Sequence, residues 1–360
     1  MRTAADILLF AAGVAVAGLT LLSAVRSTIL PRAAQDRLAR LSLLAVRALF
    51  RLRVGRSADY HRRDRVMAML APVTLLVLLS TWILALVGAY TLMYLAVATD
   101  SVTKAIELSG SSIVTLGDAV PSGLGANLVS YSEAALGLLL LALLITYLPS
   151  IYGAFARREL GVSLLRVRAG DPPQATTMLI RYHRIDESHS RLRELWQSWE
   201  TWFAELDESH TSFPILAFFR SPQPEQSWVT AAGALLDGAS LWVSAVEHPA
   251  DPEAQLCIRA GFQALGRVAA TLGLHEVTEP SPDDPIAVNR SEWERAVDEL
   301  VAAGVPVLTD RERMWRDWRG WRVNYDTVLL DLARLVEAPP APWVSDRSSL
   351  GGGRRWRGSR

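Results

Sequence analysis

The sequence predicts an all-α membrane protein with three transmembrane helices, a short re-entrant segment and a soluble α-helical domain. Three observations carry this prediction. Half of the 360 residues are hydrophobic, and the first 160 contain three long apolar segments. A short polar segment separates the second apolar segment from the third. The rest of the chain is richer in charge and shows helical periodicity, which is typical of a separate soluble part.

Each apolar segment is long enough to cross a bilayer, which requires about 20 apolar residues. The three segments are Ile7 to Val25, Met67 to Thr99 and Leu128 to Ala156. The first two contain no charged residue, and the third contains only Glu133. The second and third exceed the length of a straight crossing, so we expect them to tilt or to continue beyond the lipid.

Arginines predict the orientation of these helices. The segment 26–66 contains eleven arginines, and the third span ends at Arg157 and Arg158. Positive charge favours the cytoplasmic side, so we expect the N-terminus outside and the C-terminal part in the cytoplasm. Cleavage after Ser23-Ala24, as in a signal peptide, would leave the arginines outside, which favours a retained anchor.

The arginine-rich segment itself has the pattern of an amphipathic helix at the membrane surface. Two functions remain open for it: a slide helix that conveys movement, or a passive anchor on acidic lipid. Its arginines and leucines recur at helical spacing on two sides, at Arg37, Arg40, Arg47 and Arg51 and at Leu38, Leu41, Leu49 and Leu52.

The segment between Asp100 and Asn127 is too short for two further crossings, so it has to leave and rejoin the same face. Asp100 and Ser101 can cap a short helix that runs to about Val114, with serines near its end. Non-helical backbone at membrane depth is tolerated only when it is buried in protein or lines a water-filled cavity. A helix followed by a Thr-Leu-Gly turn can therefore direct backbone carbonyls at an ion.

This arrangement of span, pore helix, Thr-x-Gly and span resembles the two-helix bacterial pore module of the potassium channel superfamily, over residues 66–158. The family filter reads T-x-G-Y/F-G-D, and Thr115, Leu116 and Gly117 match its first three positions. Asp118 then replaces the aromatic residue and Ala119 the second glycine. An alternative alignment on Gly117-Asp118 loses the first glycine and the aromatic residue instead.

The resemblance implies a re-entrant pore helix and loop, a homotetramer and passage of a monovalent cation, with potassium as the first candidate. Glycines in the filter permit positive φ angles, and a residue with a Cβ resists them. A ring of Asp118 side chains would resemble the acidic rings of less selective cation pores. The alternative is that Asp118 only caps the turn and the pore does not conduct.

The third span contains three residues with candidate roles. Gly137 lies 19 residues after Asp118, where the family places its gating hinge, and Pro149 can kink the helix near its cytoplasmic end. The alternative is that both only shape an ordinary membrane helix. Glu133 either lies at the interface or supports the pore from behind the filter, in contact with the serines of the pore helix or with Lys104.

Residues 159–345 predict a cytoplasmic helical domain. Periodic stretches occur at about 174–206, 227–247, 252–274, 291–304 and 310–336, separated by Pro-containing breaks. Trp228 to Val246 is apolar enough to resemble a fourth span, but Asp237 at its centre favours a buried helix of the domain. Tryptophans at every third residue predict core packing or a subunit interface.

A short repeat raises one further hypothesis. Asp186-Glu-Ser-His189 recurs as Asp207-Glu-Ser-His210. On one straight helix the two copies would be roughly 30 Å apart, which prevents a shared metal site. They could still meet through a bend or between subunits as a pH or divalent-ion sensor. The alternative is a simple helix end at the second copy.

The predicted organisation is an anchor at 1–30, an amphipathic helix and linker at 31–65, a channel-like pore domain at 66–158, the helical domain at 159–345 and a flexible basic tail at 346–360. No nucleotide-binding or catalytic motif is present, so we expect no enzyme activity, no cofactor or metal and no nucleic-acid partner. The expected function is gated cation conduction in a bacterial inner membrane. The alternative is a non-conducting scaffold or sensor that acts through the helical domain.

Overall fold

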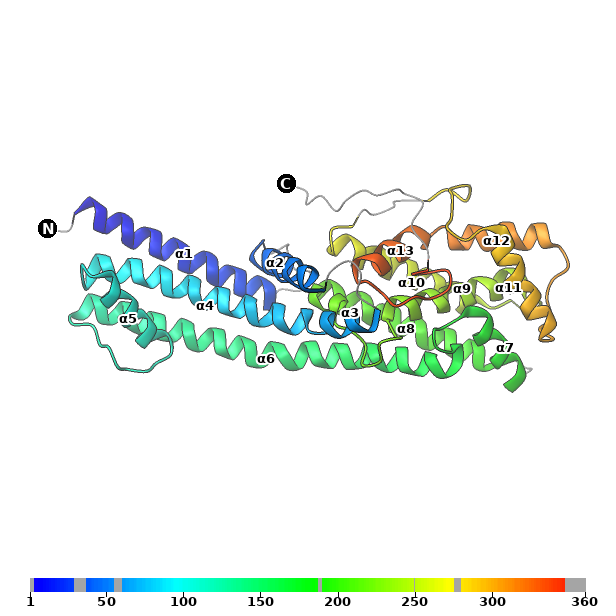
Figure 1. Cartoon of the computed structure of the whole chain (residues 1–360), viewed down its shortest axis with the longest axis horizontal. Coiled ribbons are helices and arrows are strands. Elements are labelled where there is room, and N and C mark those ends of the chain that lie inside the picture. The colour runs from blue at the N-terminus through cyan, green and yellow to red at the C-terminus, as the bar shows by residue number, and fades with distance from the viewer. Residues whose placement is uncertain are drawn as a thin grey trace. The chain divides into compact units, whose positions relative to one another are not determined.

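The computed structural model describes residues 3–28, 37–54, 60–186, 190–248, 250–274 and 280–346. Every regular element within these ranges is a helix, and one isolated antiparallel bridge joins Val246 to Val307. The chain divides into two compact units (Figure 1). The first contains Met1–Ser57 and Met69–Gly153, and the second contains Ala58–Ala68 and Ala154–Arg360. The protein is therefore all-α in its described part, as the sequence predicts.

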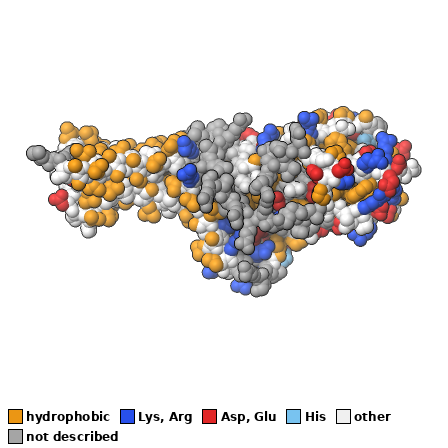
Figure 2. Space-filling model, turned by 90° about the horizontal axis from the view of Figure 1, so that it is seen from above, with side chains coloured by type: hydrophobic (Ala, Val, Ile, Leu, Met, Phe, Trp, Pro, Cys, Tyr) orange, Lys and Arg blue, Asp and Glu red, His pale blue; other side chains and the backbone are white. Residues whose placement is uncertain are grey.

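Three helical segments are long and apolar enough to cross a membrane: Ala4–Thr28, Tyr60–Val97 and Leu124–Ala169. They correspond to the three predicted spans, but the second comprises two helices, Tyr60–Met67 and Leu70–Val97, and ends before the predicted Thr99. In the most apolar stretch of Leu124–Ala169, only 11% of the residues are buried within the chain. On the face seen in Figure 2, hydrophobic side chains cover much of the end of the molecule that contains Ala4–Thr28. An apolar surface of this extent needs lipid or further protein around it.

The first unit consists of α1 (Ala4–Thr28), α2 (Arg37–Val54), α4 (Leu70–Val97), α5 (Val102–Ile113) and the part of α6 (Leu124–Ala169) that ends at Gly153. α1 packs along α4, and α5 packs on α4 as well. Gly13 permits the close approach of α1, because a Cβ at this position would collide with the carbonyl oxygen of Ala89. The indole of Trp82 donates a hydrogen bond of 3.0 Å to Ser23 and fixes the register of these two helices.

α2 is amphipathic, as predicted, and packs against α4 through Ser42 and Val46, which are buried. Another face of α2 is apolar yet exposed. Its three leucines, Leu41, Leu49 and Leu52, are 61%, 65% and 82% exposed. This face fits an interfacial helix that meets lipid with its leucines.

The second unit is built around α9 (Trp228–Ala245), in which nearly every residue is buried. Helices α7, α10, α12 and α13 all pack against α9, and α8 packs on α10. Besides these, the unit contains α3 (Tyr60–Met67), the end of α6, η1 (Pro214–Phe218) and α11 (Arg290–Ala302). The bounds of the packing helices are Ala175–Ile185 for α7, Ser190–Ser212 for α8, Pro252–Thr271 for α10, Arg311–Arg322 for α12 and Asp326–Leu335 for α13.

Two predicted helices of this region are each divided in the structure. The stretch 174–206 forms α7 and α8, and the stretch 310–336 forms α12 and α13. Apolar periodicity continues through both breaks, so periodicity alone could not reveal them. Trp196, Trp199 and Trp202 are at most 7% exposed, which confirms core packing for that stripe.

A buried ionic cluster joins α9, α12 and α13. Arg322 is fully buried and donates to Oδ1 of Asp237 at 2.6 Å and to Oδ1 of Asp326 at 2.7 Å. Tyr325 donates a further hydrogen bond of 2.9 Å to Oδ1 of Asp237. Burial opposes the charge of the guanidinium, but the two carboxylates outweigh it and raise the pKa of Arg322. Asp237 is thus a buried charged residue of α9, and its partner Arg322 lies 85 residues away in the sequence.

We predict that Arg322→Ala lowers the free energy of unfolding of the second unit by about 3–5 kcal/mol, because two buried carboxylates lose their cation. Arg313→Ala is the matched control, since Arg313 forms only an exposed i,i+4 pair with Asp317 and should cost less than about 1 kcal/mol. Thermal unfolding of the detergent-solubilised chain, followed by tryptophan fluorescence, measures both changes. Equal shifts in the two variants would contradict the prediction.

Candidate functional site

The candidate site is the connection between α4 and α6, which consists of α5 and the loop after it. α5 begins where the Ser101 hydroxyl accepts a hydrogen bond of 3.4 Å from the Lys104 amide. It ends at Ile113, with Val114 as its C-cap. One face of α5 is buried and carries three serines as well as apolar residues, namely Ala105, Leu108, Ser109, Ser111, Ser112 and Ile113. The serine cluster thus faces protein.

The loop after α5 turns sharply at its start, where two residues have positive φ angles. Thr115 has φ of 52° and Gly117 has φ of 76°, with Leu116 between them. Positive φ is uncommon for a residue with a Cβ, so Thr115 is held there by its surroundings. The Leu116 amide donates to the Ser111 carbonyl at 2.9 Å, and the Ser111 hydroxyl accepts from the Ala119 amide at 3.0 Å. Ser111 therefore binds the loop twice, at Leu116 through its carbonyl and at Ala119 through its hydroxyl.

The four predicted filter residues lie together on this loop. Thr115, Leu116, Gly117 and Asp118 are all exposed in the single chain, and the Leu116 side chain is 70% exposed. The alternation of positive φ ends after Gly117, because Asp118 and Ala119 have no positive φ.

Behind the loop, hydroxyl groups of α4, α5 and α6 form a chain of hydrogen bonds. The Ser112 hydroxyl bonds to Tyr94 at 3.0 Å and to Ser130 at 2.8 Å. The hydroxyls of Tyr90 and Ser132 form a parallel link of 3.0 Å between α4 and α6. Hydrogen bonds of this kind fix helices to one another where the apolar surroundings offer no other polar partner.

Glu133 lies on α6 and is fully buried. Its Oε1 accepts a hydrogen bond of 2.5 Å from the Ser109 hydroxyl of α5. Of the two contacts considered from the sequence, the structure therefore has the one with a serine of α5, whereas Lys104 is exposed. Oε2 of Glu133 has no hydrogen-bond partner in the described part of the chain.

Gly137 lies one turn further along α6, against the end of α5. A Cβ at this position would collide with the carbonyl oxygen of Ile113. The structure thus gives Gly137 a packing function that the sequence did not suggest. Pro149 lies inside α6, which continues as one helix to Ala169.

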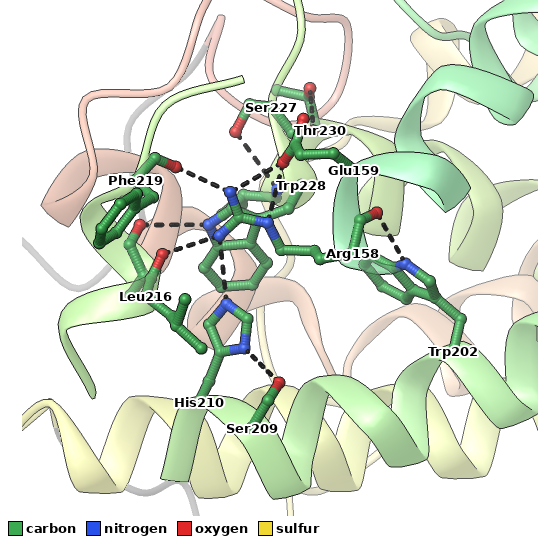
Figure 3. Close-up of polar contacts among 12 residues, drawn as sticks. Arg158, Glu159, Trp202, Ser209, His210, Leu216, Phe219, Ser227, Trp228 and Thr230 are labelled. Carbon is green, nitrogen blue, oxygen red and sulfur yellow. Dashed lines mark hydrogen bonds and ion pairs between the residues drawn. The ribbon is translucent and has the colours of Figure 1, made fainter. Parts of the chain in front are cut away.

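A second polar cluster lies wholly in the second unit and contains His210 (Figure 3). The buried guanidinium of Arg158 donates to the carbonyl oxygens of Leu216 at 2.7 Å and Phe219 at 2.8 Å, and pairs with Glu159 at 2.8 Å. His210 bonds to this guanidinium through Nε2 at 3.2 Å. Arg158 therefore connects the end of α6 to α8 and η1, a function not foreseen from its place after the third span.

The environment of His210 does not favour the sensor hypothesis. Burial and the neighbouring Arg158 hold the pKa of His210 well below its usual range. Among the described residues, no group of three or more His, Cys, Asp or Glu side chains could hold a metal ion. Asp207 forms an ion pair with Arg267 instead. Glu187, Ser188 and His189 of the first repeat lie outside the described residues, as do residues 347–360 of the predicted tail.

Sequence reasoning missed the partners of the serine cluster. Tyr90 and Tyr94 are four residues apart and therefore share one face of α4, while Ser130 and Glu133 share one face of α6. Polar residues at helical spacing inside apolar spans are the signal that could have identified both faces. The spacing alone does not show that the two faces meet at α5.

Together, the three apolar helices indicate a membrane-embedded protein whose second and third spans are connected by a short helix and an exposed loop. No protein family model matches the chain, and no curated protein or solved structure shows significant similarity to it.

We predict that Gly137→Ala loosens the attachment of α5 and lowers the melting temperature, since overpacking of this kind costs about 1–3 kcal/mol. Gly88→Ala in α4 is the control, because a Cβ at Gly88 meets no atom within 4 Å. A helical Gly-to-Ala change without a collision should be neutral or stabilising. A Gly137→Ala protein as stable as the wild type would show that α5 does not pack closely there.

We also predict that Ser111→Ala increases the mobility of the loop, because the Ala119 amide loses its acceptor. Hydrogen exchange of peptides that cover residues 114–123 should become about five times faster, as expected if one hydrogen bond of about 1 kcal/mol is lost. Ser80→Ala is the control, since the Ser80 hydroxyl bonds only to the Leu76 carbonyl within α4. Unchanged exchange in Ser111→Ala would contradict the tie between α5 and the loop.

Proposed function

We propose that the chain is a potassium-channel-like membrane protein that passively conducts a monovalent cation through a homotetrameric pore. The observation that supports this proposal most strongly is the connection between α4 and α6. A short helix there ends in a loop with two positive φ angles, and the loop is tied back to the helix by Ser111. Such a loop can direct carbonyl oxygens at an ion, as filters of cation channels do.

The exposure of the loop in a single chain favours an assembly of several copies of the chain. A single chain leaves Thr115, Leu116, Gly117 and Asp118 exposed, although they lie between two helices of membrane-spanning length. Non-helical backbone at this depth has to be covered by protein or line an aqueous path. One loop cannot surround an ion, so by analogy with the family we propose that four copies surround a common axis, with α6 as the inner helix.

Charge favours a cation over an anion. Asp118 is the charged residue of the loop, and four copies would form an acidic ring. The loss of positive φ after Gly117 shortens the row of carbonyl oxygens. We therefore propose that the Asp118 ring contributes to ion selection and that potassium is not strongly preferred over sodium.

The second unit would control the pore. α6 is continuous through Gly153 and Ala154, where the two units divide, so a movement of the second unit can reach the inner helix. α3 is also held by the second unit, because Tyr60 donates to the Pro224 carbonyl at 2.9 Å and Asp64 pairs with Arg220 at 3.1 Å. We propose that this unit is a cytoplasmic gating domain and that the N-terminus lies outside, in a bacterial inner membrane.

A second candidate function is a non-conducting membrane scaffold or sensor derived from a channel. The packing of Gly137 against Ile113 favours it, because a glycine that seals α5 to α6 is not free to act as a hinge. In that case α6 would still transmit changes from the second unit, but no ion would pass.

Flux through reconstituted protein tests the proposal. We predict that liposomes containing the wild-type chain release potassium and sodium down a gradient, and that Asp118→Asn reduces this flux about tenfold, as expected when a charge close to the ion path is removed. The rate should fall for both ions, since the Asp118 ring acts through its charge.

Asp100→Asn is the matched control, because Asp100 is an exposed carboxylate just before α5 and outside the loop. Its flux should equal that of the wild type. The absence of flux at every voltage and pH, or an equal effect of both substitutions, would remove the channel proposal. A dimeric or monomeric mass in lipid discs would also contradict a central pore.

A further inference from the structure

A polar cleft of about 300 Å³ lies within the second unit, between the start of α7, the middle of α9, α11 and the segment after α13. Its volume is at the lower end of the range for small-molecule sites. The cavity beside Arg158, by comparison, has a volume of only about 10 Å³. The cleft is therefore large enough for a small organic molecule.

One carboxylate oxygen in the wall of the cleft accepts no hydrogen bond from the described residues. Asp237 lines the cleft and is only 1% exposed. Both of its hydrogen bonds, from Arg322 and Tyr325, end on Oδ1, and no described group donates to Oδ2. An unpartnered carboxylate oxygen at the cleft can accept a hydrogen bond from a ligand, and a charged donor makes that bond stronger.

The buried cluster behind the cleft has an excess of negative charge. Arg322 supplies one positive charge, while Asp237 and Asp326 supply two negative ones. Asp326 is satisfied on its second oxygen by the Ala287 amide, at 3.0 Å. Burial raises the pKa of Asp237 and Arg322 opposes that rise, so a cation on the cleft side would further stabilise the ionised carboxylate.

The other charged side chains that line the cleft are three carboxylates and one arginine. α11 contributes Glu292, Arg295 and Glu299, and the segment after α13 contributes Asp346. The start of α7, at Ala175, adds the partial positive charge of a helix N-terminus, about half a unit. With Asp237 paired to Arg322, three carboxylates remain against one arginine and half a charge, which leaves a negative cleft and favours a cation over an anion or a neutral molecule.

An aromatic ring completes the site. Trp343 lines the cleft, and the bond of 2.8 Å from Arg322 to its carbonyl oxygen holds its backbone at a φ of 62°. The indole also packs edge-on against Trp318, at 5.4 Å between ring centroids. An indole face beside carboxylates is a favourable wall for an ammonium group and its carbon chain.

We propose that this cleft binds a small organic cation, with its ammonium group at Oδ2 of Asp237 and its carbon chain against the Trp343 ring. The site is lined by α7, α9 and α11, so a bound ligand would add contacts between helices that already pack on one another. This inference does not depend on conduction, because a channel and a sensor could both carry such a site.

Calorimetric titration of the full chain in discs of neutral phosphatidylcholine tests the proposal. The probe is 1,4-diaminobutane, and 1,4-butanediol is a neutral molecule of the same length. We expect saturable binding of the diamine and none of the diol. An equal response to both, an equal response to Mg²⁺, or no saturable binding at millimolar concentration would overturn the proposal.

Three substitutions on α11 locate the site without disturbing the core. Glu299→Gln should weaken binding about three- to tenfold and Arg295→Gln should strengthen it by a similar factor, because each changes one charge at the edge of the cleft. Asp298→Asn is the matched control: Asp298 pairs with Arg311 away from the cleft, so binding should not change. The same effect in Asp298→Asn and Glu299→Gln would show non-specific attraction and overturn the proposal.

Asp237→Asn tests the anchor itself and should abolish binding. Since this substitution also weakens the pair with Arg322, its melting temperature has to be measured beside the titration. If the variant does not fold, the charge series on α11 still decides the proposal. Wild-type affinity in a folded Asp237→Asn protein would overturn it.

Discussion

The first unit depends on one constraint: polar side chains among apolar helices have to bond to one another, because hydrocarbon offers them no partner. Ser112 meets this constraint by bonding to Tyr94 of α4 and Ser130 of α6, and Ser109 does so by bonding to Glu133. These bonds hold α5 between the two long helices. The position of α5 then decides where the loop begins, and Ser111 decides where it turns.

The same constraint operates in the second unit, with charges in place of hydroxyls. Arg158 and Arg322 are both almost fully buried, and each has its donors directed at carboxylates and backbone carbonyls. Breaking such a pair costs more than forming it contributes, so these arginines specify one arrangement of helices. Asp237 differs from the other partners because one of its oxygens remains available in the cleft.

These arrangements suggest how the two units could act together. α6 passes from one unit to the other without a break. In the second unit, its residue Arg158 donates a hydrogen bond to the Phe219 carbonyl. A ligand in the cleft would stabilise one packing of α7, α9 and α11. Coupling of this kind requires a difference in ligand affinity between two states of the second unit. α6 is the element through which such a difference would reach the loop.

The sequence by itself determined the all-α class, the three apolar helices and the short helix with its Thr-Leu-Gly turn, because apolar length, periodicity and capping residues act locally along the chain. It also predicted a buried helix around Asp237 and a buried tryptophan stripe on α8. Only the tertiary structure decided that Glu133 meets Ser109, that Gly137 meets Ile113 and that Asp237 meets Arg322. These partners are 24 to 85 residues apart, and no local pattern specifies which faces of two helices come together.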